Sequence, residues 1–469
     1  MGAETGKIKT KEDLFETICN ASNLDTLGFF VGAGFSKELI SDDYWKKAYS
    51  WEELIIECRK RMNLTNEDDK KESEELQKLK ENTSYPEQSS KLCREYAKKN
   101  KVSYDDAVGK IKSIIAEVLN LDPNENKKNR YKNWFNRLSP NWIVTTNYDF
   151  ILESVIGGEA LTIPPDGCFC KIKGMIPVFH IHGTCKDPDG IIITNEDYTR
   201  MFRPSDYRQA RLPFLIKESC VLMIGYGLGD INVVTAVDWS KNVYTNINSQ
   251  YNFPIIQLLL NKENPDPDPY ENDGVIIYEI KNLESFFKEL ISYYKNHQKN
   301  YELKISKIQK TTQEFINAEE SDIDKFISDR EYRKKILQFM QDLQPEFGYV
   351  YNSFHYYLIM ALAVVDARSS EDGAFEWYEE KLKLILDVFS YISLDKIPPS
   401  VFSALSNALN SVAYYIDLEG KHTKGKAHEA TDYWFKKNSS ISKDVVEELE
   451  RSCRTNKALV GLSHLLKTI

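Results

Sequence analysis

The stretch "LGFFVGAGFS", residues 27–36, decides the fold class of this chain. Its apolar run, residues 27–31, leads into two glycines, Gly32 and Gly34, as a buried strand of a parallel sheet does before a helix begins. Three further apolar runs end in polar or glycine-rich tips, and helical patterns separate them. This alternation predicts a doubly wound, parallel α/β sheet.

The overall composition limits the classes of function. The chain has 469 residues, which predicts two or three domains. A net charge of −10 disfavours direct nucleic-acid binding by the protein as a whole. No apolar run approaches the roughly 20 residues that span a bilayer. The polar N-terminus lacks a secretory signal, so we expect a cytoplasmic protein without a membrane association.

The pattern changes along the chain. Residues 1–300 contain the predicted strands, and a long helical segment at about 45–135 interrupts them. Residues 301–469 show helical spacing broken by turn residues, which predicts an all-helical C-terminal domain for regulation or assembly. The expected C-terminal helices lie around residues 321–343, 350–367, 373–393, 399–417, 426–437 and 443–467.

Chemistry is expected at the strand tips, because open α/β sheets bind ligands outside the carboxyl ends of their strands. At the first tip, Gly32 and Gly34 allow a tight turn and a close backbone approach, and a following helix N-terminus suits a pyrophosphate. The chain has no Walker lysine pattern, which disfavours ATP or GTP hydrolysis. A plain strand-to-helix turn is the alternative.

Two other tips repeat this arrangement. "TTNYD", residues 145–149, presents Asn147 and Asp149, which could fix ribose hydroxyls and a water or simply form an Asx turn. "GYGLGD", residues 225–230, is a second glycine-rich strand end, which could bring backbone N–H groups to a dinucleotide or form a tight turn. Several such tips in one sheet favour a binding site over isolated turns.

The last tip, "PVFHIHGT", residues 177–184, carries two histidines that point to the same face of a strand. Such a pair could bind zinc with further ligands from Cys168, Cys170, Cys185 or Asp187. The eight cysteines form no CxxC pair, so they are expected to be free thiols. His182 lies at the tip, whereas His180 lies further back and is expected to be a packed histidine.

Together, "GAGFS", "TTNYD", "HG" and "GYGLGD" resemble the sirtuin-like, or SIR2-like, domain, in particular that of bacterial antiphage defence proteins. The resemblance covers about residues 20–290. It implies a Rossmann-like NAD-binding domain with a helical insertion, which agrees with the helical segment at about 45–135.

The resemblance also implies roles for individual residues. Asn147 would be the catalytic amide, His182 the catalytic histidine, and Asp149 would support the nicotinamide pocket. In addition, Asn261, at the end of a later apolar run, would contact a ribose of NAD. The full set of residues that would bind NAD is Gly32, Ala33, Gly34, Phe35, Ser36, Thr146, Gly225, Gly227, Asp230 and Asn261.

Sirtuin deacylases hold zinc with two CxxC pairs, which this chain lacks. The resemblance therefore implies hydrolysis of NAD+ to nicotinamide and ADP-ribose, without a metal, as an abortive-infection effector in antiphage defence. A sensor or scaffold that binds NAD or ADP-ribose without turnover is one alternative, and a metal-dependent hydrolase is another. We expect a homo-oligomer, and a HerA-like ATPase or an argonaute-type protein is a possible partner.

Overall fold

The computed structural model describes residues 8–40, 48–64, 84–201, 207–227, 238, 253–369 and 375–469. The chain forms two compact units, Met1–Lys299 and Asn300–Ile469. The functions assigned to the two parts stay predictions.

A largely parallel sheet forms the centre of the N-terminal unit. In the described part of the chain it has eight strands in the order β3-β4-β2-β1-β5-β6-β8-β7, and only β7 runs antiparallel, at one edge. This confirms the predicted parallel α/β fold. The strands are β1 (Leu27–Val31), β2 (Trp142–Thr145), β3 (Ala160–Ile163), β4 (Ile176–His180), β5 (Cys220–Ile224), β6 (Ile255–Leu260), β7 (Tyr270–Asn272) and β8 (Val275–Ile280).

Four adjacent strands of the sheet end together. Every residue of β1, β2, β4 and β5 is buried, as expected for strands covered on both faces. In register, Val31 at the end of β1 lies beside both Thr145 and Ile224, and Thr145 lies beside His180. The predicted tips therefore meet at one edge of the sheet.

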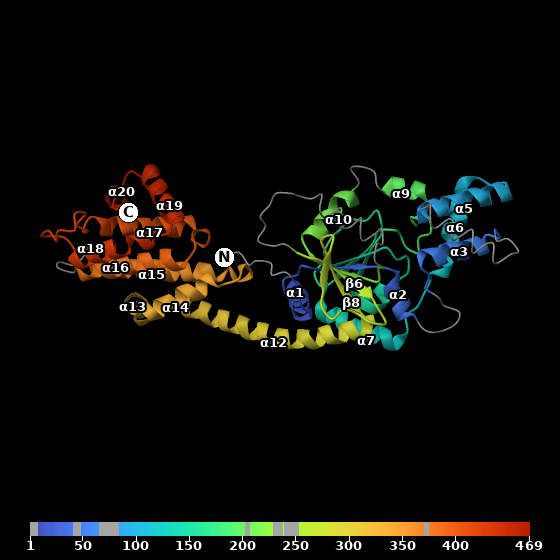
Figure 1. The fold of residues 1–469 in the computed structure, drawn as a ribbon, viewed down its shortest axis with the longest axis horizontal. Helices are drawn as coiled ribbons and strands as arrows, with labels where there is room; N and C mark the ends of the chain where they lie inside the picture. The colour runs from blue at the N-terminus through green and yellow to red at the C-terminus, as the bar shows by residue number, and fades with distance from the viewer. Residues whose placement is uncertain are drawn as a thin grey trace. The chain divides into compact units, whose positions relative to one another are not determined.

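Helices cover both faces of this sheet (Figure 1). Phe29 packs with residues of α1 and α7, whereas the next residue, Phe30, packs with residues of α10, because successive strand residues point to opposite faces. Before α12 (Leu283–Ile316), the described residues of this unit form the helices α1 (Lys11–Asn23), α2 (Ala33–Leu39), α3 (Trp51–Arg61), α5 (Tyr85–Asn100), α6 (Tyr104–Val118), α7 (Glu125–Leu138), α8 (Ile151–Ile156), the 3₁₀ turn η1 (Gly157–Glu159), α9 (Asn195–Met201) and α10 (Tyr207–Lys217).

The predicted insertion is helical. Helices α3, α5, α6 and α7 fall between α2 and β2, and α3, α5 and α6 form a group beside the sheet, with α9 next to α5 (Figure 1). Capping boxes explain two of their starts: Ser50 with Glu53 begins α3, and Ser103 with Asp106 begins α6.

Local sequence patterns did not predict every element. The apolar residues Ile191–Ile193 are buried but form no strand, because this segment only crosses the end of β4, where Ile192 N donates to His182 O at 2.8 Å. Strands β3 and β7 were not expected, since both are short and carry no fully buried apolar run. Helix α12 (Leu283–Ile316) contains the boundary between the two units, which falls after Lys299.

The C-terminal unit is helical, as predicted. The expected helix at 321–343 is split at Asp329, whose extended backbone ends α13 and whose side chain caps α14. The pattern at 443–467 is split after Thr455. The elements that follow α12 are α13 (Glu320–Ser328), α14 (Arg330–Gln341), η2 (Pro345–Phe347), α15 (Val350–Ser369), α16 (Glu376–Tyr391), η3 (Leu394–Lys396), α17 (Pro399–Ala413), α18 (His428–Lys437), η4 (Asn438–Ser440), α19 (Lys443–Thr455) and α20 (Val460–Leu466).

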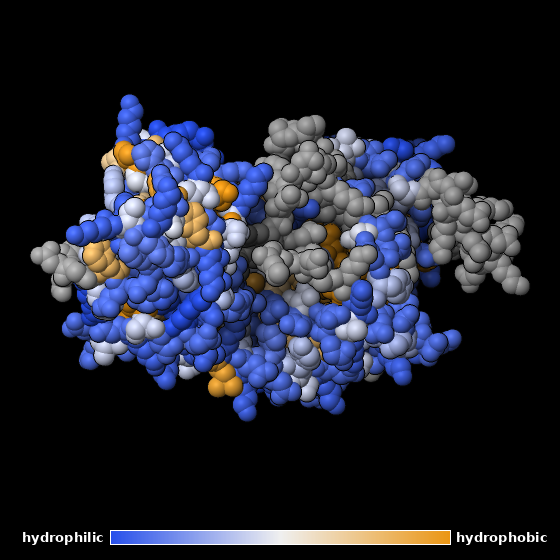
Figure 2. Space-filling view, turned by 60° about the vertical axis from the view of Figure 1, so that its left-hand side comes forward, coloured by the Kyte–Doolittle hydropathy of each residue, from blue (hydrophilic) through white to orange (hydrophobic). Residues whose placement is uncertain are grey.

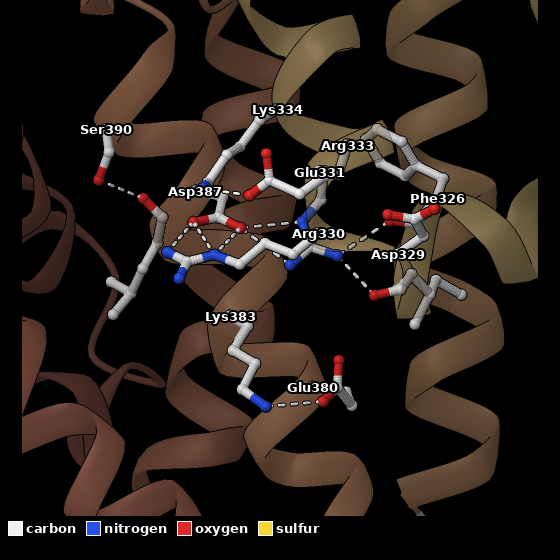
Figure 3. Close-up of polar contacts among 12 residues, drawn as sticks. Phe326, Asp329, Arg330, Glu331, Arg333, Lys334, Glu380, Lys383, Asp387 and Ser390 are labelled. Carbon is white, nitrogen blue, oxygen red and sulfur yellow. Dashed lines mark hydrogen bonds and ion pairs between the residues drawn. The ribbon is translucent and has the colours of Figure 1, made fainter.

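A buried charge cluster connects three of these helices (Figure 3). Asp387 on α16 accepts hydrogen bonds from both Arg330 and Arg333 on α14, the shortest at 2.8 Å. Arg333 also donates to Phe326 O on α13 at 2.9 Å. Because Arg333 is 0% and Asp387 is 2% exposed, the fold depends on these pairings.

The molecular surface is mostly polar. On the face that Figure 2 shows, hydrophobic residues are scattered in small groups among hydrophilic ones. Among the helices of the described residues, none is both long and apolar enough to cross a membrane.

Candidate functional site

The two glycine tips contact each other at the end of the sheet. Gly32 N donates to Ile224 O at 2.8 Å, and Gly34 N donates to Gly225 O at 3.1 Å. A Cβ on Gly34 would lie 2.7 Å from Gly225 Cα, and one on Gly225, whose φ is +80°, would lie 2.6 Å from Phe35 N. Glycine is therefore required here for the packing of β1 against β5.

A buried hydrogen-bond network joins the first two tips. Ser36 Oγ on α2 donates to Asp149 Oδ2 at 2.8 Å, and Asn147 Nδ2 donates to Ser36 Oγ at 3.0 Å and to Gly32 O at 3.1 Å. Because both hydrogens of the Asn147 amide are directed to these acceptors, its Oδ1 is left to accept a hydrogen bond from a ligand hydroxyl or a water.

The carboxyl group of Asp149 lies in surroundings that disfavour its ionised form. Burial raises the pKa of its carboxyl above the ordinary value, although hydrogen bonds from Ser36 Oγ and Ile151 N and the nearby His180 act in the opposite direction. Perturbed carboxyl groups of this kind are common at functional sites.

His180 lies behind Asn147 and is fully buried, at 0% exposure. Its Nδ1 is 2.9 Å from Asn147 O, and its Nε2 is 2.9 Å from Glu153 Oε1 on α8. Both ring nitrogens therefore have protein partners, as expected for a packed histidine.

His182 is surrounded by aromatic rings. Its Nε2 is 3.2 Å from the hydroxyl of Tyr198 on α9, and the rings of Trp51 and Tyr148 lie 6.2 and 6.5 Å from the imidazole. The next residue, Gly183, has a φ of +92°, and a Cβ there would lie 2.4 Å from Gly190 O. The tight turn after His182 thus depends on glycine.

A cavity of about 320 Å³ opens at these tips. Strand-tip residues form one part of its wall, and the insertion contributes the aromatic rings of Trp51 and Tyr85, which stack at 5.9 Å. The lining residues from the strand tips and α2 are Ala33, Gly34, Ser36, Lys37, Thr146, Asn147, Tyr148, Asp149, Gly225, Tyr226 and Gly227. Those from the following segment and the insertion are Ala48, Tyr49, Ser50, Trp51, Leu54, Tyr85, Leu119 and Leu121.

Most of the predicted site residues meet at this cavity. Gly32 is adjacent to it, because its carbonyl holds the Asn147 amide. His182 does not line it, but it contacts Trp51 and Tyr148, which do. The roles assigned to these residues stay predictions.

Two predicted residues, Phe35 and Asn261, have side chains directed elsewhere, and a third is not described. The side chain of Phe35 is in the core, 5.6 Å from the ring of Tyr131. The amide of Asn261 donates to Glu279 Oε2 at 2.7 Å and to Asn264 O at 3.0 Å, so it caps a turn after β6. Asp230 lies outside the described residues.

The sequence reasoning missed the aromatic wall. Tyr148 and Tyr226 lie inside the quoted motifs but received no role, and Trp51 and Tyr85 belong to an insertion that was identified only as helical. The one available signal was the capping box that begins with Ser50, because it fixes Trp51 as the first residue of a helix.

The insertion also holds the helix that contacts His182. Glu196 on α9 accepts hydrogen bonds from Ser90, Arg94 and Tyr104 at 2.7–2.9 Å. The neighbouring Asp197 pairs with the buried Lys112 at 3.1 Å. These contacts fix α9, and with it Tyr198, against α5 and α6.

The described residues provide little for a metal ion. Among them, no three His, Cys, Asp or Glu side chains are grouped as metal ligands. Cys168 and Cys170 are exposed and Cys185 is buried, and all three are free thiols.

A parallel α/β sheet with a cavity at its strand ends belongs to the ligand-binding doubly wound class. Residues 141–273 match the family model for the SIR2-like domain. This range contains the tips with Asn147, His182 and Gly225, whereas the tip with Gly32 precedes it. The chain thus carries a SIR2-like domain, as the resemblance predicted, and such a domain implies NAD binding.

A curated relative supports this assignment. Defense-associated sirtuin 2 of Bacillus subtilis is 20% identical to this chain over 277 residues, so the two proteins are distant homologues. The aligned segment covers 58% of this chain and 24% of the relative, and the chain therefore matches about a quarter of that protein's length.

Proposed function

We propose that this protein hydrolyses NAD+ to nicotinamide and ADP-ribose. The observation that carries the proposal is the cavity at the strand tips, where the Asn147 amide is fixed by Gly32 and Ser36 beside a wall of aromatic rings. The SIR2-like domain supports NAD as the substrate.

The chemistry requires little from the protein beyond positioning. Nicotinamide leaves as a neutral molecule from a cationic precursor, so the bond to ribose breaks through an oxocarbenium-like state without an acid. Asn147 Oδ1 would accept a hydrogen bond from the ribose or from the attacking water. His182, which contacts Trp51 and Tyr148 in the cavity wall, would accept the proton of that water.

The first experiment is NAD+ turnover with product identification. Asn147→Ala and His182→Ala should each lower the rate of nicotinamide release by about 10²–10⁴-fold, the usual effect of removing a group that moves or orients a proton. Asn100→Ala, at the exposed end of α5, is the control for an asparagine lost elsewhere. Wild-type turnover in a folded Asn147→Ala/His182→Ala double variant would contradict the assignment.

Product analysis separates the alternatives. Binding of NAD+ without nicotinamide release under all activating conditions would favour a sensor or scaffold. Acyl-ADP-ribose formed with an acylated peptide would reinstate deacylation, and stoichiometric zinc in the purified protein would favour a metal-dependent hydrolase.

The proposed biological role is an abortive-infection effector in antiphage defence, and the name of the Bacillus subtilis relative, defense-associated sirtuin 2, supports it. Such an activity requires an inactive state before infection, and we assign regulation or assembly to the helical C-terminal unit. Assembly into a homo-oligomer, or with a partner such as a HerA-like ATPase or an argonaute-type protein, would supply the trigger. Phage challenge of cells with the wild type and with Asn147→Ala, followed by measurement of cellular NAD+, tests this role.

A further inference from the structure

We infer that Glu153 and His180 are positioning residues for Asn147, acting as a buried carboxylate–imidazolium pair that fixes the Asn147 backbone and thereby its side-chain amide at the cavity. The inference rests on the proposed function, since it assigns Asn147 the contact with substrate. Neither Glu153 nor His180 lines the cavity, so both act through Asn147.

The hydrogen-bond partners suit a doubly protonated imidazole. A carbonyl oxygen only accepts, so His180 Nδ1, 2.9 Å from Asn147 O, carries a hydrogen. On the other side, Glu153 Oε1 is 2.9 Å from His180 Nε2 and also accepts from Thr162 Oγ1 at 2.8 Å. With an ionised Glu153 carboxylate, which only accepts, His180 Nε2 carries a hydrogen as well.

The charges around the ring favour the same state. Burial on its own lowers the pKa of His180, but the hydrogen bond and the charge of Glu153 raise it above the ordinary value, with help from Asn147 O and Asp149. The charged groups that face the ring are Glu153 from α8 and Asp149 from the turn after β2. Strand β3 contributes Thr162, and the same turn places the ring of Phe150 at 5.6 Å.

The pair completes the restraint on Asn147. Its N–H donates to Thr145 Oγ1 at 3.0 Å, its amide donates to Gly32 and Ser36, and its carbonyl accepts from His180. The bond from His180 restrains the carbonyl of the peptide group that follows Asn147, in addition to the bond from Cys185 N to Tyr148 O at 2.8 Å. A misplacement of about 1 Å at such a group costs about 100-fold in rate.

The test compares Glu153→Gln with Glu159→Gln. In the Glu153→Gln variant the new side-chain amide can donate to a neutral His180 Nε2, so the network stays satisfied while the charge is lost. Glu159 is exposed in η1, just after α8, and its substitution makes the same change in net charge. The measurements are kcat and KM for NAD+ across pH, and the titration of His180 by NMR with labelled histidine, of which the chain has seven.

The sign of the expected change follows from the raised pKa. The imidazolium is present below the folded-state pKa and is lost as pH rises through it, so kcat should fall on the alkaline side while KM changes little. In Glu153→Gln this decline, and the NMR midpoint of His180, should move to lower pH, because the charge of Glu153 no longer raises the pKa of the imidazole. In Glu159→Gln both should stay at their wild-type positions. His180→Gln should retain partial activity and lose the alkaline decline, because its amide can still donate to Asn147 O but does not titrate.

An NMR midpoint of His180 below that of an ordinary histidine, an unchanged profile in Glu153→Gln, or an equal shift in both variants would overturn the inference. Absence of turnover in the wild type at every pH would instead overturn the proposed hydrolysis. In that case the pH dependence of NAD+ affinity decides: a shift confined to Glu153→Gln supports the positioning pair, whereas an unshifted dependence, or no measurable affinity, overturns it.

Discussion

Two buried carboxyl groups, one in each unit, have opposite surroundings. In the C-terminal unit, Asp387 is matched by two arginines, and Arg333 is also bonded to backbone carbonyls (Figure 3). In the N-terminal unit, Asp149 accepts from the neutral groups Ser36 Oγ and Ile151 N and lies beside a cavity. Direct ion pairing satisfies the first carboxylate, whereas the second lacks such a partner and has a raised pKa.

This difference separates a structural cluster from a candidate active site. A buried ion pair is costly to break, so the Asp387 cluster should govern folding of its unit. A buried carboxyl group beside a cavity costs stability in the resting protein, which is the usual relation between stability and function. Substitutions in the two regions should therefore separate the effects on stability from those on activity.

The largest effect on stability is expected for Asp387→Ala. It leaves Arg333 buried without its carboxylate, and the free energy of unfolding of the C-terminal unit should fall by about 3–5 kcal/mol. Asp395→Ala, an exposed carboxylate in η3, is the control and should change stability by less than about 0.5 kcal/mol. Urea unfolding followed by circular dichroism measures both. Equal stability of the two variants would show that the cluster is not structural.

A smaller effect is expected where the two glycine tips meet. Gly225→Ala adds a Cβ at a φ of +80° against Phe35 N, so the N-terminal unit should lose about 2 kcal/mol, because β1 and β5 must separate. Gly227→Ala is the matched control, since a Cβ there meets nothing within 4 Å. Differential scanning calorimetry tests the pair. Similar melting temperatures in both variants would contradict the packing argument.

The smallest expected effect is a gain in stability, for Asp149→Asn. Because the folded-state pKa of Asp149 is raised, its contribution to stability is complete below the unfolded-state pKa and is lost as pH rises through the folded-state value. The free energy of unfolding of Asp149→Asn should therefore exceed that of the wild type by about 1 kcal/mol at pH 7. This gain in stability should vanish below about pH 4. Unfolding at a series of pH values measures it. A loss of stability at pH 7 would show that the hydrogen bonds of Asp149 outweigh its burial.

Much of the fold could be predicted from the sequence, because its signals are local. The runs that became β1, β2, β4 and β5 are continuous and apolar, and the helical pattern of the C-terminal unit follows from spacing. The elements that the sequence did not predict correctly also have local explanations. Ile191–Ile193 resembles a buried strand but has no neighbouring strand to pair with, and β3 is too short and too exposed to be distinguished from a turn.

For the candidate site, the sequence supplied the strand tips and their order. Parallel strands end at one edge, so Gly32, Asn147, His182 and Gly225 were bound to lie near one another once the strands were recognised. The tertiary structure decided the rest. It showed that the glycines serve the contact between two tips, that aromatic rings of the insertion complete the wall, and that Glu153 reaches His180. The physical reason is that hydrogen bonds and ring contacts between distant segments depend on how helices pack on the sheet, which leaves no periodic signal in the sequence.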